Sequence, residues 1–225
     1  FTATLTATPP GAGTPTGTVT VSDGSASCTG TLPATSCALV SATPGAKSLT
    51  ATYSGDANFS ASASSAATHQ VNKAATTTAI VSDTPDPSAV GQSYTVTYSV
   101  AVTAPGAGTP SGTVTVSDGS ASCTGTLPAT GCQLPSNTPG TKLLTATYNG
   151  DANFSASTST TATHQVNKAA TTTAILSDTP DPSVVGQPYT VSYSVAVTPP
   201  GTGTPSGTVT VSDGSASCTG TLPAT

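Results

Sequence analysis

The sequence predicts an all-β protein built from tandem antiparallel β-sandwiches, with about seven strands in each unit. Three observations lead to this prediction. The chain repeats itself at a step of 95 residues, apolar and polar residues alternate with a period of two, and no segment has helical periodicity. A unit of this length matches one small sandwich domain and is far longer than a solenoid repeat.

The repeat is clearest in one long block. The segment GTVTVSDGSASCTGTLPAT begins at Gly17, Gly112 and Gly207, so each copy starts 95 residues after the one before it. Phe1 falls in the middle of a repeat, and Thr225 falls early in another. The sequence therefore predicts three tandem repeats: a first repeat that lacks its first strand (1–73), a complete second repeat (74–168), and a third repeat truncated on its C-terminal side (169–225).

The second repeat shows its expected strands in order. In SYTVTYSVAV, Tyr94, Val96 and Tyr98 share one face while threonine and serine occupy the other, which is typical of a half-buried strand. The triplets SDG after GTVTVS and NGD after KLLTATY are typical of turns. The expected strands are 76–82, 93–102, 112–117, the two segments around Cys123 and Cys132, 142–148 and 157–166.

Charge is scarce throughout the chain. Charged residues make up 6% of it, against about 25% in ordinary domains, and they are nine aspartates and four lysines. The net charge of −5 and the lack of arginine remove the basic surface that nucleic acids and anionic membranes require. No apolar run is long enough to cross a membrane. We therefore expect no nucleic-acid partner and no membrane insertion in this segment.

The cysteines come in pairs nine residues apart. Cys28 precedes Cys37, and Cys123 precedes Cys132, with a proline-containing turn between the members of each pair. Such a turn can bring two antiparallel segments to disulfide distance, so we expect a disulfide in each pair, with reduced buried thiols as the alternative. The partner of Cys218 would lie beyond Thr225. A disulfide places the protein outside the cytosol.

Residues 127–131, Leu-Pro-Ala-Thr-Gly, resemble the signal that sortases cleave to attach proteins to a cell wall. A working signal is followed by an apolar span and a basic tail, but the residues after Gly131 form neither. The block also recurs at 31–36 and 221–225, so it belongs to the repeat. We therefore expect LPATG to be the tip of a disulfide-closed hairpin.

Three segments carry a resemblance to a known family. GTPSGTVTVSDG, LTATYNGDANFSASTST and VNKAATTTAILSDTPDPSVVGQ together resemble the bacterial Ig-like repeats of large secreted and cell-surface proteins, a group marked by YxGDxNF near the end of each unit. The resemblance covers the whole chain, and it implies that the sandwiches are immunoglobulin-like. It also implies a stalk, spacer or adhesin shaft more often than an active site. The cysteine pair departs from the typical member.

Candidate ligand and modification sites are few. Asp83, Asp86 and Asp118 fall at one expected pole of the sandwich and could converge on calcium, which prefers carboxylates and carbonyls. The alternative is that they cap turns, because SDG and DTPDP are turn sequences. Asn58 and Asn153 lie in the glycosylation sequon Asn-Phe-Ser on expected exposed turns.

The sequence does not indicate an enzyme. The two histidines, His69 and His164, have no neighbouring pattern of a nucleophile and base, and GxSxG is absent. We expect both to be half-exposed strand residues. Every polar feature is copied in each repeat, so a single catalytic cleft is not expected, and neither is a cofactor.

Two functions are consistent with this pattern. One is a structural protein of the extracellular space or cell surface, whose tandem Ig-like repeats form a rod, stalk or filament and assemble with copies of themselves, end to end or laterally, or with other surface components. The other is an adhesin or a set of carbohydrate-binding accessory repeats in a larger secreted protein. The lack of tryptophan and the apolar-alternating tyrosines favour the structural hypothesis.

Overall fold

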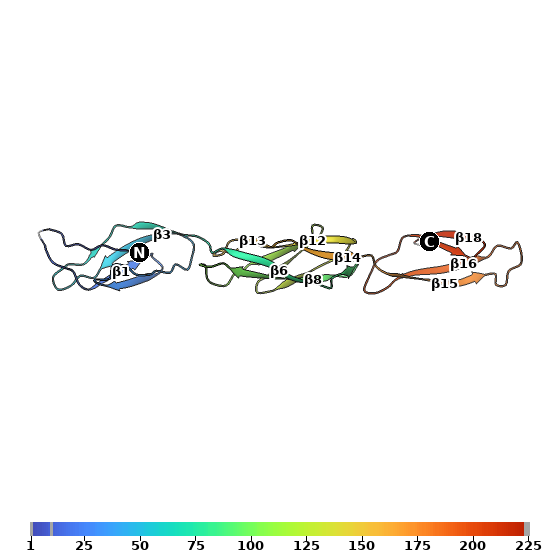
Figure 1. The fold of residues 1–225 in the computed structure, drawn as a ribbon, viewed down its shortest axis with the longest axis horizontal. Helices are drawn as coiled ribbons and strands as arrows, with labels where there is room; N and C mark the ends of the chain where they lie inside the picture. Colours follow the sequence, from blue (N-terminus) through green and yellow to red (C-terminus); the bar gives the residue numbers. More distant parts are fainter. Residues whose placement is uncertain (1, 10, 223–225) are drawn as a thin grey trace. The chain divides into compact units, whose positions relative to one another are not determined.

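The computed structural model describes residues 2–9 and 11–222. In this part of the chain every regular element is a β-strand and none is a helix, so no helix there could span a membrane (Figure 1). The chain divides into two compact units, each discontinuous in sequence. Unit 1 comprises Phe1–Ala75, Val102–Gly108 and Gly150–Ser155, and unit 2 comprises Thr76–Ala101, Thr109–Asn149 and Ala156–Thr225. The division does not follow the 95-residue step, and the boundaries of the three repeats stay predictions.

Unit 1 contains one five-stranded antiparallel sheet. Its strands are β1 (Thr18–Ser22), β2 (Ser27–Thr31), β3 (Gly45–Tyr53), β4 (Ser62–Ala63) and β5 (Ala67–Val71). β1 pairs with β2 and β3, while β3 also pairs with β4 and β5. Within the same unit, Ala74 forms a parallel bridge with Phe154.

The second repeat contains a two-sheet sandwich whose strands lie in unit 2, except for Val102 at the end of β8. The larger sheet has the order β10 (Ser122–Thr126), β9 (Thr113–Ser117), β12 (Gly140–Tyr148), β14 (Ala162–Asn167) and β7 (Ser88–Ala89), and β13 (Ser157–Thr158) also pairs with β12. The smaller sheet has the order β11 (Gly131–Leu134), β8 (Tyr94–Val102) and β6 (Thr76–Thr84). β9 pairs antiparallel with β10 and β12, β12 pairs antiparallel with β13 and β14, and β8 pairs antiparallel with β11, whereas β14 and β7 are parallel. The predicted all-β fold of tandem Ig-like sandwiches is confirmed.

Seven strands of this sandwich have four or more residues, as predicted, and two have only two residues. The expected strand 157–166 is divided into β13 and β14, because the hydroxyl and amide of Ser159 bond to Ala146 between the two paired segments. The short strand β7 was missed, since Ser88 and Ala89 follow a proline and show no alternation.

The third repeat contributes two hairpins to unit 2. β15 (Thr171–Thr179) pairs with β16 (Thr190–Val197), and β17 (Gly207–Ser212) pairs with β18 (Ser217–Leu222). The last residues of its TLPAT block, 223–225, lie outside the described residues.

The core of the second repeat consists of the inward residues of both sheets. The period-two pattern of the sequence is realised, because alternate residues of β8, β9 and β12 are buried. Fully enclosed apolar residues with no exposed surface are Val96, Val114, Val116, Leu134, Leu144, Ala146 and Tyr148.

The disulfide of the second repeat joins its two sheets. Both predicted bonds, Cys28–Cys37 and Cys123–Cys132, are present, and Cys218 is free. Cys123 lies on β10 at the edge of the larger sheet, whereas Cys132 lies on β11 at the edge of the smaller one. We expected LPATG to be the tip of a hairpin. It is instead the turn by which the chain passes from the larger sheet to the smaller one. Pro128, Ala129 and Thr130 in this turn are exposed.

We predict that replacing Cys123 and Cys132 together by alanine lowers the free energy of unfolding of the second repeat by about 2–4 kcal/mol, because the crosslink restricts the unfolded chain. Hydrogen exchange of the β9 and β12 amides measures the loss. Cys218→Ser is the control and should leave the exchange unchanged. Unchanged exchange in the double variant would show that the crosslink does not stabilise the sandwich.

Candidate functional site

A polar cluster built around His164 lies in the core of the second repeat. His164 is on β14, where it alternates inward with Val166, and it has no exposed surface. Its partners come from four other segments of unit 2, namely β6, the turn after it, β7 and the start of β8. They are Asp83, Asp86, Ser88 and Tyr94.

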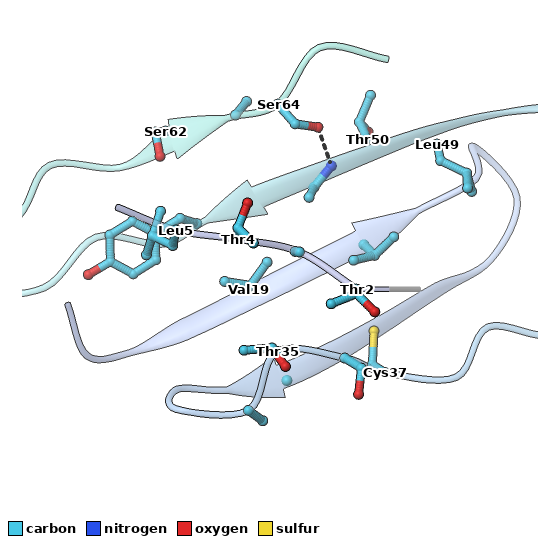
Figure 2. A pocket seen from close by; sticks show the side chains of 18 of the residues that line it. Thr2, Thr4, Leu5, Val19, Thr35, Cys37, Leu49, Thr50, Ser62 and Ser64 are labelled. Atoms are coloured by element: carbon cyan, nitrogen blue, oxygen red, sulfur yellow. Dashed lines mark hydrogen bonds between the residues drawn. The ribbon is translucent and has the colours of Figure 1, made fainter. Parts of the chain in front are cut away.

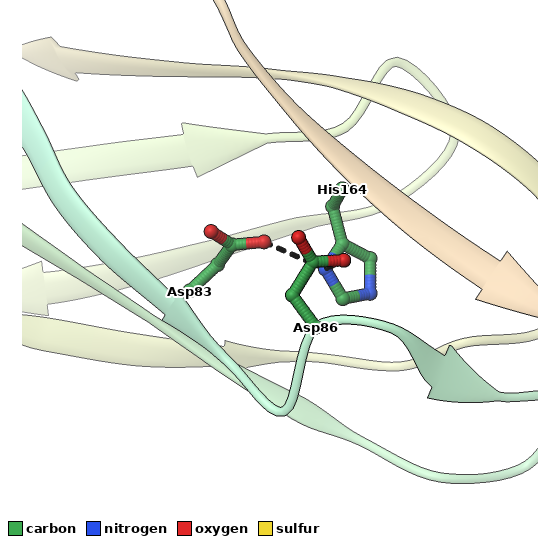
Figure 3. A group of neighbouring side chains, drawn as sticks. All are labelled: Asp83, Asp86 and His164. Carbon is green, nitrogen blue, oxygen red and sulfur yellow. Dashed lines mark hydrogen bonds and ion pairs between the residues drawn. The ribbon is translucent and has the colours of Figure 1, made fainter.

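Two carboxylates face one nitrogen of the histidine. Nδ1 of His164 lies 2.7 Å from Oδ2 of Asp83 and 3.4 Å from Oδ1 of Asp86 (Figure 3). Oδ1 of Asp86 also accepts a hydrogen bond from the backbone N–H of Gln165 at 3.0 Å. The side chain of Asp83 is 15% exposed and that of Asp86 is 40% exposed, so this side of the cluster opens towards solvent.

The other nitrogen is enclosed. Nε2 of His164 lies 2.8 Å from Oγ of Ser88, which is 2.6 Å from Oγ of Ser136, and both serines are buried. The ring of Tyr94 stacks on the imidazole, with centroids 3.7 Å apart and planes inclined by 11°. The imidazole is thus fixed by hydrogen bonds in its plane and by an aromatic ring on its face.

Tyr94 connects the cluster to the turn after β9. Its hydroxyl donates to Oδ2 of Asp118 at 3.3 Å, and Oδ1 of Asp118 accepts from the backbone N–H groups of Ser120 and Ala121. Burial tends to raise the pKa of Asp118, but the donors at Ala121, Ser120 and Tyr94 outweigh it and lower that pKa. Burial and the charge of Asp118 raise the pKa of Tyr94.

Two of the three expected calcium ligands come together. Asp83 and Asp86 form a group with His164, whereas Asp118 is outside that group and caps its turn, as the alternative reading expected. The expectation that His164 is half-exposed is wrong. Ala162, His164 and Val166 share one face of the strand, and the apolar residues on either side of His164 are the sequence signal that could have placed it in the core.

The order carboxylate, imidazole, hydroxyl in Asp83, His164 and Ser88 is that of a hydrolytic triad. Ser88, however, is only 2% exposed, and its hydroxyl also bonds Ser136. A hydroxyl enclosed in this way does not reach a substrate carbonyl. The arrangement instead satisfies buried polar groups, which stabilises and specifies the core.

The other repeats contain parts of the cluster. In the third repeat Tyr189 donates to Asp213 at 3.4 Å, as Tyr94 does to Asp118, while Asp178, Asp181 and Ser183 are exposed. In the first repeat His69 is exposed, and Ser41, the counterpart of Ser136, donates to Oδ2 of Asp23 at 2.6 Å.

Asp23 is held ionised by its donors. The hydroxyl of Ser41, followed by the backbone N–H groups of Ala26 and Ser25, lowers the pKa of Asp23 from 3.8 to about 2.

A hollow of about 420 Å³ lies on one face of the sheet in unit 1 (Figure 2). Val19, Val21, Leu49 and Tyr53 are among its lining residues. Their counterparts 95 residues later are the enclosed core residues Val114, Val116, Leu144 and Tyr148. The hollow therefore corresponds to a sandwich core, and we assign no ligand to it.

Both sequon asparagines are on the surface. Asn58 and Asn153 are exposed, and their backbone N–H groups donate to Oδ1 of Asp56 and Asp151, two residues earlier. These aspartates shape the turns of the two GDANF segments. Glycosylation of the asparagines stays a prediction.

The chain matches the family model Bacterial Ig-like domain (group 3) over residues 1–72 and 81–167, and it belongs to this family. No curated protein matches it. Among solved structures it is similar to the fibronectin(III)-like modules of Clostridium thermocellum CbhA, with 14% identity, a TM-score of 0.34, and coverage of 70% of this chain and 82% of that chain. Ig-like domains of this kind are typically non-catalytic extracellular modules, and the disulfides agree with that.

We predict that Ser88→Ala destabilises the second repeat by about 1–3 kcal/mol, because it removes the partner of the enclosed Nε2 of His164. Hydrogen exchange of the β14 amides measures the loss. Ser183→Ala is the matched control, since Ser183 occupies the same DTPDPS context in the third repeat but is exposed, and it should change stability by less than about 0.5 kcal/mol. Equal effects of the two variants would contradict the prediction.

We predict that NMR titration of the Asp23 carboxyl gives a pKa of about 2 and that Ser41→Ala moves it towards 3.8. Because the folded pKa is the lower one, the ionised carboxylate stabilises unit 1 above pH 3.8, and this contribution is lost as the pH falls through about 2. Ser136→Ala should leave the Asp23 titration unchanged. A titration of Asp23 near 3.8 in the unaltered chain would refute the assignment.

Proposed function

We propose that this chain is a segment of a structural extracellular protein, in which tandem Ig-like repeats form a rod, stalk or filament at the cell surface. The observation that carries the proposal is the recurrence of one crosslinked module at a 95-residue step. Cys28–Cys37 and Cys123–Cys132 occupy equivalent positions in it. The reach of such a protein grows with the number of modules, and each module needs only to stay folded.

The interior of the second repeat suits a module that must resist unfolding. Its disulfide links the edges of the two sheets, and the His164 network connects β14 to β6, β7 and β8. Opening the sandwich would expose a buried imidazole and two buried serines as well as the apolar core. Extracellular proteins benefit from both features, because proteases act on opened states.

The sheet edges of the second repeat bear on how copies associate. β7 and β13 are only two residues long, and β10 and β11 are tied together by Cys123–Cys132, so these four strands offer little template for another chain. β6 is a nine-residue edge strand, and Val81 on it is exposed. We therefore propose that tandem linkage provides the length and that any lateral association of copies uses β6.

The second candidate function is an adhesin or a carbohydrate-binding accessory repeat. Carbohydrate-binding modules display planar aromatic side chains, but all three tyrosines of the second repeat are buried, namely Tyr94, Tyr98 and Tyr148. The chain has no tryptophan. Identical repeats could still bind weakly and gain by multivalency, so this function stays the alternative.

Electron microscopy of the native protein released from cells, with negative stain, tests the proposal. Strands of nine residues rise about 30 Å, so each repeat with its connector should occupy roughly 35–45 Å along the axis. We expect long, uniform rods or filaments with this spacing. Compact particles without it would overturn the proposal, and short rods that end in a distinct globular head would favour the adhesin alternative.

A further inference from the structure

We propose that Asp83, Asp86 and His164 form a binding site for a divalent transition-metal cation of the zinc type. The inference does not depend on the proposed function. It starts from two carboxylate oxygens, of Asp83 and Asp86, that face Nδ1 of His164 at 2.7 Å and 3.4 Å (Figure 3). A neutral imidazole can donate a hydrogen bond to only one of them.

The charges at this point are unbalanced. A single N–H on Nδ1 of His164 can point at only one of the two oxygens, and even a protonated imidazole supplies one positive charge against two negative ones. Among the described residues, no lysine forms a salt bridge with Asp83 or Asp86. A divalent cation between the three groups would neutralise both carboxylates at once.

The histidine is oriented as metal-ligating histidines usually are. Its other nitrogen, Nε2, is held by the hydroxyl of Ser88, and the stacked ring of Tyr94 fixes the plane of the imidazole. When Nε2 carries the proton and donates to Ser88, Nδ1 presents its lone pair to the carboxylates. The hydroxyl of Ser88 can accept the hydrogen bond from Nε2–H because it can rotate to donate its own hydrogen to Ser136.

The distances suit zinc coordination after a small adjustment. Zinc bonds of about 2.0–2.2 Å in a tetrahedron place ligand atoms about 3.4 Å apart. The distance from Nδ1 to Asp86 already has this value, and the three ligand atoms lie within 4.8 Å of one another. Asp83 must withdraw by about 0.7 Å. The exposure of Asp86 provides an entry path and room for water as the fourth ligand.

The ligand set selects the class of cation. An imidazole nitrogen with two carboxylates suits zinc and similar transition metals, whereas calcium takes six to eight oxygen ligands. Asp118, the third carboxylate expected for calcium, belongs instead to the turn after β9. The structure thus points to a different cation from the one that the aspartates alone suggested.

The chain carries its own controls. Asp178 and Asp181 repeat the DTPDP context of Asp83 and Asp86, but the position 95 residues after His164 lies beyond Thr225. His69 repeats the THQVN context, but the positions 95 residues before Asp83 and Asp86 lie before Phe1. The proposal therefore requires one strong site in the 225-residue chain, not two or three.

Calorimetric titration of the full chain with zinc chloride tests this requirement. Cys218→Ser is present in every sample, because a free thiol could bind zinc by itself. We expect one equivalent of zinc, and we expect Asp86→Asn to weaken binding about tenfold or more. Asparagine keeps the oxygen that accepts from Gln165, so the fold should persist. Asp181→Asn and His69→Ala should leave the affinity unchanged.

A second readout identifies the ligand atom. Nitrogen NMR of the imidazoles should show that zinc shifts Nδ1 of His164 and leaves His69 unaffected. The proposal is overturned by a stoichiometry of zero, by equal affinities of the unaltered chain and Asp86→Asn, by equal losses in Asp86→Asn and Asp181→Asn, or by calcium displacing zinc from the site.

Discussion

The burial of one sheet face against the other is the constraint on which the rest of this structure depends. Strands that alternate apolar and polar residues are stable only when a second layer covers their apolar side. In the second repeat β6 and β8 belong to that layer, and Val114, Val116, Leu144 and Tyr148 have no exposed surface. In unit 1 the equivalent residues line an open hollow. The segment equivalent to β6 would precede Phe1, so this part of the covering layer has no counterpart among residues 1–75.

The same burial determines which hydrogen-bond partners the polar groups in the core of the second repeat must have. A histidine at an inward strand position must find partners inside the protein, because an unpaired buried nitrogen is costly. The turn after β6 carries the chain from the smaller sheet to the larger one, and this crossing brings Asp83, Asp86 and Ser88 to His164. His69 has the same sequence context, but the counterparts of these neighbours would precede Phe1, and His69 is exposed. The site is therefore a consequence of how the two sheets meet.

The disulfide and the histidine network act on different parts of one module. Cys123–Cys132 joins the edge strands β10 and β11. His164 on β14 contacts residues of β6, β7 and β8. Both features hold the two sheets together. A module closed in this way suits the extracellular rod or filament that we propose, in which little charge is available to mediate specific contacts.

The sequence by itself determined the all-β fold, the seven longer strands and the two disulfides, because these depend on local alternation and on short spacings along the chain. It also identified Asp83 and Asp86 as candidate ligands. Only the tertiary structure decided that Cys123–Cys132 joins two sheets and that Asp118 caps a turn. It also decided that His164 is buried against Asp83, Asp86 and Ser88. Asp83 and His164 are 81 residues apart, and their contact depends on which sheets their strands join and in which register. Neither property is encoded in the alternation of a single strand, so local patterns could not reveal it.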